Sequence, residues 1–446
     1  MNDFIMSAIA LFAMSSLGLL ATNSLPKNEQ LLPRLSLLAH MLTAPALLAI
    51  MDYIFVASDV HYYFRTGETL TKLMRSDPLR WIPETFKFML QLPNGLEVYF
   101  PEQFSGAYAT TSMAAAVSFV MLLLNDAQYA SFIFMAGLAY LAKLASYRGV
   151  RLALPNMNPS RVAIAMMLVP SVVFWSSGIV KESFALIGLG ILMLWISRAT
   201  KTSLWTSPHL LLTGVVLLAL IKPYLLFPFI LSAGTWIGLV KLKGSNLAVK
   251  PIVIIAVIVL FFSALAGLSV AFPEFSLSKF GESTSHMQQA GATTDGGSNY
   301  NLGNAEATSL SGQLAFAPIA LTTVLVRPFF FEIRNFSMGI ASIESTILLY
   351  LLIQLFRKNT VKQVFRAIRS SPPLAYCLVY TLVAGLAIGL ATSNFGTLSR
   401  YRIPMMPYYT LLVLVLTDKR SGVTALRRAE AATPSVSDLK VFSKPS

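Results

Sequence analysis

The stretch LAYCLVYTLVAGLAIGLAT at 374–392 contains no charged residue. A helix of roughly 20 apolar residues spans the hydrocarbon core of a bilayer and satisfies its own backbone polar groups there. This stretch therefore predicts a transmembrane helix. Similar apolar runs recur along the chain at 4–22, 35–57, 108–147 (one or two crossings), 161–176, 180–197, 205–221, 223–240, 251–272, 313–331, 337–356 and 403–417.

The composition agrees with these runs. Of the 446 residues, 55% are hydrophobic and 12% are charged, whereas a soluble globular protein has about 25% charged residues. An ordinary soluble enzyme is thereby excluded. We expect an all-α, polytopic transmembrane helical bundle of about 11–12 membrane segments within residues 1–417, followed by a basic tail at 418–446 that is too polar to fold alone.

The net charge is +14, and the positions at which Lys and Arg accumulate next to the helix ends predict an orientation. Lys and Arg accumulate in cytoplasmic loops, so we expect membrane lipids and no nucleic acid as partners. The basic clusters are Lys143, Arg148, Arg151 and Arg161; Arg198 and Lys201; Lys241, Lys243 and Lys250; Arg357, Lys358, Lys362, Arg366 and Arg369; and Lys419, Arg420, Arg427 and Arg428. The poorly basic loops that alternate with these clusters are then external, and they lie at 175–182, 222–224, 273–312 and 393–402.

Two segments interrupt this alternation. If 313–331 crossed completely, the Arg357–Arg369 cluster would lie outside, so we expect 313–335 to be re-entrant or interfacial. If 108–147 crosses once, the polar segment 58–107 is external; with two crossings it is cytoplasmic, and both counts remain open.

The two long hydrophilic segments differ in composition. Acidic, basic and aromatic residues alternate in 58–107, which is typical of short amphipathic helices on a membrane surface. The segment 273–312 is rich in Gly, Ser, Thr, Asn and Gln. We expect it to be one long external loop, mobile until a ligand orders it.

The first candidate motif is SDVHYY at 58–63, directly after an apolar helix. A carboxylate at a helix end in the interface can be desolvated enough to accept a proton from a hydroxyl, which makes Asp59 a candidate general base. His61 is a candidate to line the same site. The alternative is an acid and a histidine that are merely solvated.

The second motif is PSVVFWSSGIVKE at 170–182. Lys181 and Glu182 open an apolar helix, and adjacent charges at this depth are costly without a partner or a wet cavity. They therefore predict a site. The alternative is an interfacial anchor formed by Trp175 and Lys181.

The third motif is SNFGTLSRYRIP at 393–404. Arg400 and Arg402 lie on the predicted external side, and two forked guanidiniums there suit a phosphate or diphosphate. Arg327 and Lys222 are further cations on that side. Any one of them could instead reach for lipid headgroups.

Other kinds of chemistry lack their motifs. The chain contains no P-loop, no HExxH and no Cys or His cluster with metal spacing. The sequence therefore requires no cofactor and identifies no metal ligand, although a divalent cation stays open. The single cysteine, Cys377, has no disulfide partner in the chain.

The order of these motifs, together with the Arg-Pro-Phe segment at 327–329, resembles bacterial polytopic glycosyltransferases of the GT-C superfamily. It is also similar to membrane proteins of exopolysaccharide and O-antigen gene clusters. The resemblance implies a GT-C-like bundle in the bacterial inner membrane, with its active site facing the periplasm. It also implies a polyprenyl phosphate- or diphosphate-linked sugar donor and a saccharide acceptor.

By the same resemblance, Asp59 matches the catalytic acid of the first loop and Glu182 stands where a second acid is expected. Arg400 and Arg402 would hold the lipid phosphate. The frequent Asp-Glu pair of the family is here Asp59-Val60, which leaves metal use open. A Wzy-like polysaccharide polymerase, a lipid-linked saccharide transporter and an accessory subunit remain alternatives to the transferase.

Overall fold

The computed structural model describes residues 2–54, 59–96, 98–100, 108–243, 276–292, 298–304 and 306–418, with scattered positions between 255 and 270. Most of the predicted segment 251–272 and the tail 419–446 lie outside the described residues. Within the described ranges the secondary structure is helical without a strand, apart from one isolated antiparallel bridge between Asn299 and Asn394. The prediction of an all-α fold is confirmed.

Seven of the described helices are long and apolar enough to cross a membrane. They are α1 (Asn2–Asn23), α2 (Leu31–Tyr53), α6 (Gln128–Ala153), α9 (Lys181–Ala199), α11 (Leu226–Lys243), α16 (Phe336–Lys358) and α18 (Pro372–Ala391). The helices α7 (Pro159–Met167) and α8 (Pro170–Ser176) are bent by 44° and add an eighth span if the pair counts as one. The chain is therefore a multi-pass membrane protein.

The sequence predicts 11–12 segments. The described residues contain fewer helices of membrane-spanning length because several apolar runs form shorter helices, and the predicted run 251–272 lies mostly outside the described residues. The shorter helices are α5 (Tyr108–Leu123), α10 (Pro208–Ile221), α15 (Ala317–Val326) and α20 (Met406–Leu416). None reaches the roughly 20 residues that a full crossing requires. The α15 helix occupies the segment 313–335 that we expected not to cross.

The run 108–147 is divided into α5 and α6. Asn125 and Asp126 lie between the two helices, and both have a positive φ, 53° and 63°. Asn and Asp tolerate this left-handed conformation better than most residues. Only α6 is long enough to cross, which favours the single crossing of the two counts.

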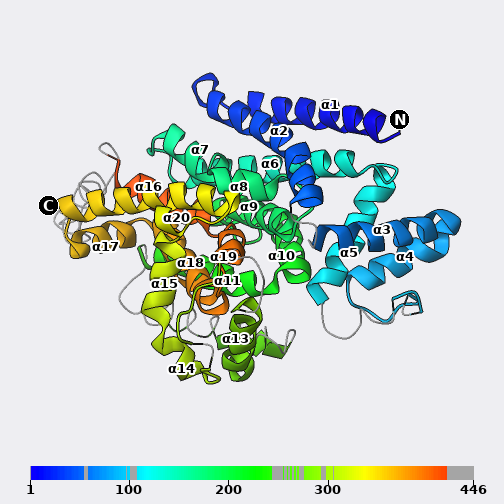
Figure 1. The fold of residues 1–446 in the computed structure, drawn as a ribbon. Coiled ribbons are helices and arrows are strands. Elements are labelled where there is room, and N and C mark those ends of the chain that lie inside the picture. The colour runs from blue at the N-terminus through cyan, green and yellow to red at the C-terminus, as the bar shows by residue number, and fades with distance from the viewer. Residues whose placement is uncertain are drawn as a thin grey trace.

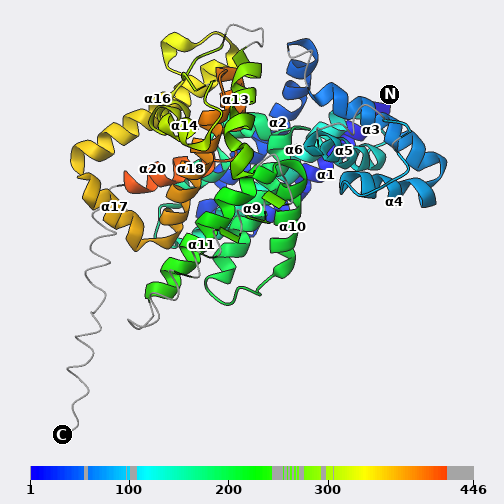
Figure 2. The same cartoon turned by 90° about the horizontal axis from the view of Figure 1, so that it is seen from below.

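The segment 58–107 contains the predicted short helices, α3 (Asp59–Ser76) and α4 (Pro78–Met89). They pack on α5 around a separate small core that includes Leu70, Trp81 and Phe88. These three helices lie at one end of the molecule, and α16 and α17 (Val361–Ser370) lie at the opposite end (Figures 1 and 2).

The segment 273–312 differs from the expected loop. It contains α13 (Leu277–Ala292) and the first residues of α14 (Leu310–Ala315). Gln288 of α13 is buried and donates hydrogen bonds from its side-chain amide to the carbonyls of Leu390 (2.6 Å) and Thr392 (2.7 Å). Composition alone cannot reveal these tertiary contacts, which hold the helix against the end of α18.

The centre of the bundle is the contact between α6 and α9. A Cβ on Gly190 of α9 would lie 2.3 Å from the carbonyl oxygen of Ala142 of α6, so only glycine permits this approach. Small residues allow such close backbone packing between membrane helices. The α1–α2 hairpin packs on α6 from one side, and α10 packs on α9 from the other.

Candidate active site

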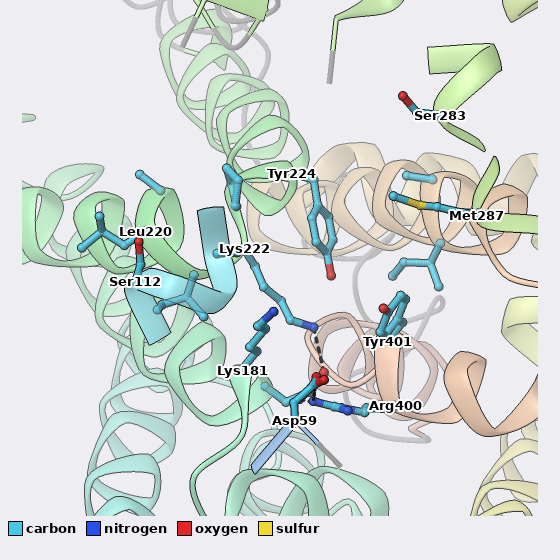
Figure 3. Close-up of a pocket in the computed structure, with 18 of the residues that line it drawn as sticks. Asp59, Ser112, Lys181, Leu220, Lys222, Tyr224, Ser283, Met287, Arg400 and Tyr401 are labelled. Atoms are coloured by element: carbon cyan, nitrogen blue, oxygen red, sulfur yellow. Dashed lines mark hydrogen bonds and ion pairs between the residues drawn. The ribbon is translucent and has the colours of Figure 1, made fainter. Parts of the chain in front are cut away.

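A cavity of about 580 Å³ lies where the ends of several helices meet (Figure 3). Five charged residues line it: Asp59, Lys181, Glu182, Lys222 and Arg400. They come from α3, from the start of α9, from the end of α10 and from α19 (Phe395–Tyr401). Segments far apart in the sequence thus bring their charges to one place.

Local structure explains where each charge stands. Asp59 begins α3, and Lys181 and Glu182 begin α9, where the helix dipole favours the two carboxylates. Lys222 ends α10 because Pro223, the next residue, disfavours helical backbone at the position before it. Arg400 lies in the last turn of α19.

Glu182 is at the centre of a buried ion network. Its Oε1 accepts a hydrogen bond from Lys222 Nζ at 2.8 Å, and its Oε2 lies 3.0 Å from Arg400 Nε. The side chain of Glu182 is 1% exposed and that of Lys222 is 5% exposed. Both carboxylate oxygens are therefore committed to cations, which offsets the cost of burying these charges.

The same network keeps its two cations charged. Burial alone would lower the pKa of Lys222, but the Glu182 carboxylate raises it above its usual range. Burial acts in the same direction on Arg400, and the carboxylates of Glu182 and Asp59 outweigh it, so the pKa of Arg400 is also raised.

Asp59 is the accessible carboxylate of the cluster. Its side chain is 53% exposed, and its Oδ2 lies 3.7 Å from Arg400 Nη2. Lys181, unlike Lys222 and Arg400, is held by a hydroxyl group: its Nζ donates to Thr110 Oγ1 of α5 at 2.8 Å. The three cations and two carboxylates leave one net positive charge at this end of the cavity, which suits an anionic ligand.

Residues of the motif at 170–182 also pack against the charged cluster. Arg400 lies with its guanidinium carbon 5.6 Å from the centre of the Trp175 ring, at cation–π distance. A Cβ on Gly178 would lie 2.3 Å from the Phe132 ring, so glycine is required where the α8–α9 connection passes α6. The motif therefore positions Arg400 as well as carrying Lys181 and Glu182.

Three predicted site residues do not line the cavity. Arg402 is fully buried and donates to the carbonyls of Arg327 (2.8 Å) and Ala341 (3.0 Å) and to Ser345 Oγ (2.9 Å). Arg327 forms an ion pair with Glu332 and lies over the ring of Phe395. His61 lies beside Asp52, with 3.9 Å between Nδ1 and Oδ1.

Sequence reasoning did not select several residues that line the cavity. The rings of Tyr224 and Tyr401 both lie near Lys222 Nζ, with their centres 5.8 Å and 5.0 Å from it (Figure 3). Both tyrosines are direct or near neighbours of predicted cations in the sequence. That proximity is the one signal that could have identified them.

The rest of the cavity wall is mostly apolar or carries small polar groups. From α10 and α18 come Ala219, Leu220, Ile221, Ala387, Ile388 and Ala391, and from α13 come Phe280, Ser283, Thr284 and Met287. The four α13 residues have the spacing of one helix face. An amphiphilic ligand could therefore place a charged group against the cations and an apolar part along this wall.

Metal coordination has no prepared ligand set here. Among the residues that the structure describes, no three His, Cys, Asp or Glu side chains gather as a metal ion would need.

Comparison of the chain with protein-family models, with curated proteins and with solved structures finds no match.

Proposed function

We propose that this protein is an integral membrane glycosyltransferase. It would transfer a sugar from a polyprenyl phosphate- or diphosphate-linked donor to a saccharide or lipid-linked acceptor, on the periplasmic face of a bacterial inner membrane. One observation carries the proposal: an accessible carboxylate, Asp59, faces the cations Lys181, Lys222 and Arg400 in a cavity with an apolar wall.

The chemistry is a direct displacement at the anomeric carbon of the donor. Asp59 takes the proton of the acceptor hydroxyl while the acceptor oxygen forms its bond to that carbon. The bond between the carbon and the phosphate oxygen breaks, and its electron pair leaves with the phosphate. General-base assistance of this kind contributes typically about 10²–10⁴-fold to the rate.

The cations stabilise the charge that develops on the leaving phosphate. Lys181 has no carboxylate within salt-bridge distance among the described residues and is held by Thr110, so its charge is available to an anion. Arg400 lies between the two carboxylates. Charges fixed before the reaction starts can contribute several kcal/mol to the transition state.

Glu182 acts as a positioning residue in this proposal. Its buried carboxylate binds both Lys222 and Arg400, so it is poorly placed to accept a proton from a substrate. It fixes the two cations and reduces their repulsion. Asp59 therefore carries the general-base role alone.

The apolar wall supports a lipid-linked donor over a free nucleotide sugar. Residues such as Leu220, Ile221 and Ile388 extend from the charged end of the cavity, and an isoprenoid chain gains about 25 cal/mol for each Å² it buries. A lipid-linked phosphate would thus bind through its phosphate group at the charged end of the cavity and through its isoprenoid chain along the apolar wall.

The test is the substitution Asp59→Asn, with Glu68→Gln as its matched control. Glu68 is an exposed acid on the same helix that pairs with Lys72 and does not line the cavity. We expect Asp59→Asn to lose glycan transfer in membranes supplied with polyprenyl-linked sugars, with unchanged expression and insertion, and Glu68→Gln to retain it. Transfer at the wild-type rate by Asp59→Asn would refute the assignment.

A further inference from the structure

A second charged surface lies at the other end of the molecule, on α17 and the end of α16. Five exposed cations form it: Arg357, Lys358, Lys362, Arg366 and Arg369. No Asp or Glu occurs between Glu344 and Asp418. Within the described part of the chain, none of the five cations lies within salt-bridge distance of a carboxylate. This surface therefore carries positive charge that no carboxylate of the described residues neutralises.

The α17 helix is firmly placed. Thr360 and Gln363 form a capping box at its start, with hydrogen bonds of 3.3 Å and 3.1 Å between each side chain and the other residue's backbone N–H. Val364, Ala367 and Ile368 are buried, and the helix packs on α18. It connects α16 and α18, which are both long enough to cross a membrane (Figure 2). We therefore infer that α17 lies at the membrane surface where both helices end.

Around the axis of α17, the sides that do not face the protein carry exposed apolar residues on one side and cations on the next. Val361 and Phe365, one turn apart, are 71% and 59% exposed. They lie between the buried face and the cationic face formed by Lys362, Arg366 and Arg369, as the 3.6-residue period of the helix requires. A helix lying in the interface has this order, with apolar side chains at the acyl boundary and cations at the headgroups.

We propose that α17 and the end of α16 bind anionic phospholipid headgroups, with Val361 and Phe365 inserted at the acyl boundary of the same leaflet. Charge complementarity selects the ligand, because five unpaired cations favour phosphate groups that carry net negative charge over zwitterionic headgroups. Each cation near an anionic surface contributes roughly fivefold to binding. The surface is separate from the cavity and does not depend on the proposed function.

The test is lipid binding to the purified full chain in detergent, measured by native mass spectrometry during titration with phosphatidylglycerol or phosphatidylcholine. We expect wild type to bind phosphatidylglycerol more tightly. The variant Lys362→Gln/Arg366→Gln/Arg369→Gln should weaken that binding by about a hundredfold, toward the level of phosphatidylcholine. The charge-preserving variant Lys362→Arg/Arg366→Lys/Arg369→Lys should retain the preference.

A matched control removes the same charge elsewhere. Arg198, Lys201 and Lys241 are also exposed cations near helix ends, and Arg198→Gln/Lys201→Gln/Lys241→Gln should keep the preference for phosphatidylglycerol. Equal affinity of wild type for the two lipids overturns the proposal and leaves the surface to a soluble acidic partner. Loss of the preference in the control but not in the α17 variant overturns it as well.

A second measurement does not depend on the multiple variant folding. In a Cys377→Ala background, Phe365→Cys and Arg366→Cys are spin-labelled in turn in bilayers that contain phosphatidylglycerol. We expect the label at 365 to be relaxed by oxygen in the acyl region and the label at 366 by an aqueous nickel chelate. Equal access of the nickel chelate to both positions contradicts the insertion of Phe365.

Discussion

Arg400 and Arg402 are separated by one residue, yet their guanidiniums lie in different environments. Arg400 reaches the cavity and contacts Glu182 and Asp59, whereas Arg402 is fully buried among the carbonyls at the end of α15 and on α16. The reason is helical geometry. Residues two apart on a helix differ by about 200° around its axis, so the pair cannot present both side chains to one ligand.

Substituting the two arginines should distinguish a residue that lines the cavity, Arg400, from one that only supports the fold, Arg402. Arg402→Gln removes buried hydrogen bonds to Arg327, Ala341 and Ser345, and each unsatisfied buried group costs about 1–3 kcal/mol. We expect a clearly lower thermal midpoint in detergent. Arg400→Gln should instead abolish the thermal stabilisation that added polyprenyl phosphate gives. Wild-type stability of Arg402→Gln together with loss of that lipid response would contradict this division.

Glu182 should be the most stability-sensitive residue of the charged cluster. Glu182→Gln leaves Lys222 buried without a carboxylate, and removing one partner of a buried ion pair costs about 3–5 kcal/mol. The double variant Glu182→Gln/Lys222→Met removes both members and should regain part of the loss. The check is a double-mutant cycle from unfolding in detergent. Purely additive effects would show that Glu182 and Lys222 do not interact, contrary to their 2.8 Å contact.

The stability of the α1–α2 turn should depend on pH through Glu29. Burial raises the pKa of Glu29, but hydrogen bonds from Arg151 and Tyr147 outweigh burial and hold the pKa below its ordinary value of 4.5. Because the folded-state pKa is depressed, the carboxylate stabilises the fold above the ordinary value, and this contribution is lost as the pH falls below it. Thermal midpoints measured from pH 7 downward should decline below about pH 4.5. Glu29→Gln should show a shallower decline, and an identical decline would count against the assignment.

Gln288 should hold α13 over the cavity. Its side-chain amide donates to two carbonyls at the end of α18, and its backbone carbonyl accepts from Ser393 Oγ at 2.8 Å. Gln288→Leu removes both side-chain bonds. The Thr392 carbonyl then loses its donor, at about 1–3 kcal/mol, whereas the Leu390 carbonyl keeps the hydrogen bond from Asn304 Nδ2 at 3.1 Å. We expect faster amide hydrogen exchange across Leu277–Ala292 and unchanged exchange in α6. A control is Gln289→Leu, and equal acceleration in both variants would show that the Gln288 bonds are not what holds the helix.

The product distinguishes the proposed transferase from a polymerase. If the chain adds one sugar, its Asp59→Asn variant should accumulate lipid-linked units that lack a residue. If it polymerises, the same variant should accumulate complete single repeat units. Mass spectrometry of the lipid-linked pool from cells carrying the variant reads out which of the two occurs, and no accumulation of either kind would speak against both enzymes.

The sequence predicts the coarse fold well and the site in part. Uncharged runs such as 374–392 identify membrane helices because the bilayer demands that length and polarity. Shorter runs such as 403–417 mislead, since a short helix buried by its neighbours is equally apolar. Asp59, Lys181, Glu182, Lys222 and Arg400 are predicted as one external group, and the structure brings them together.

The remaining features depend on tertiary contacts that no local pattern encodes. The polar segment 273–312 has the composition of a loop, yet bonds to the end of α18 hold part of it as a helix. The pairing of Glu182 with Lys222 joins residues forty positions apart. The position of Arg402 does not need such contacts to be understood. Once Phe395–Tyr401 is helical, the two-residue spacing from Arg400 directs the two side chains to different sides.

On the proposed function, residues near 59 and near 401 share one aqueous recess that opens to the periplasmic side of the membrane. The direct measurement is labelling of Asp59→Cys and Tyr401→Cys, each in a Cys377→Ala background, with a membrane-impermeant maleimide in intact cells, with Arg366→Cys as the control for the opposite side. We predict that 59 and 401 are both labelled, that polyprenyl phosphate slows both reactions, and that 366 reacts only after permeabilisation. Labelling of 59 and 401 from opposite sides of the membrane would show that they do not share one recess.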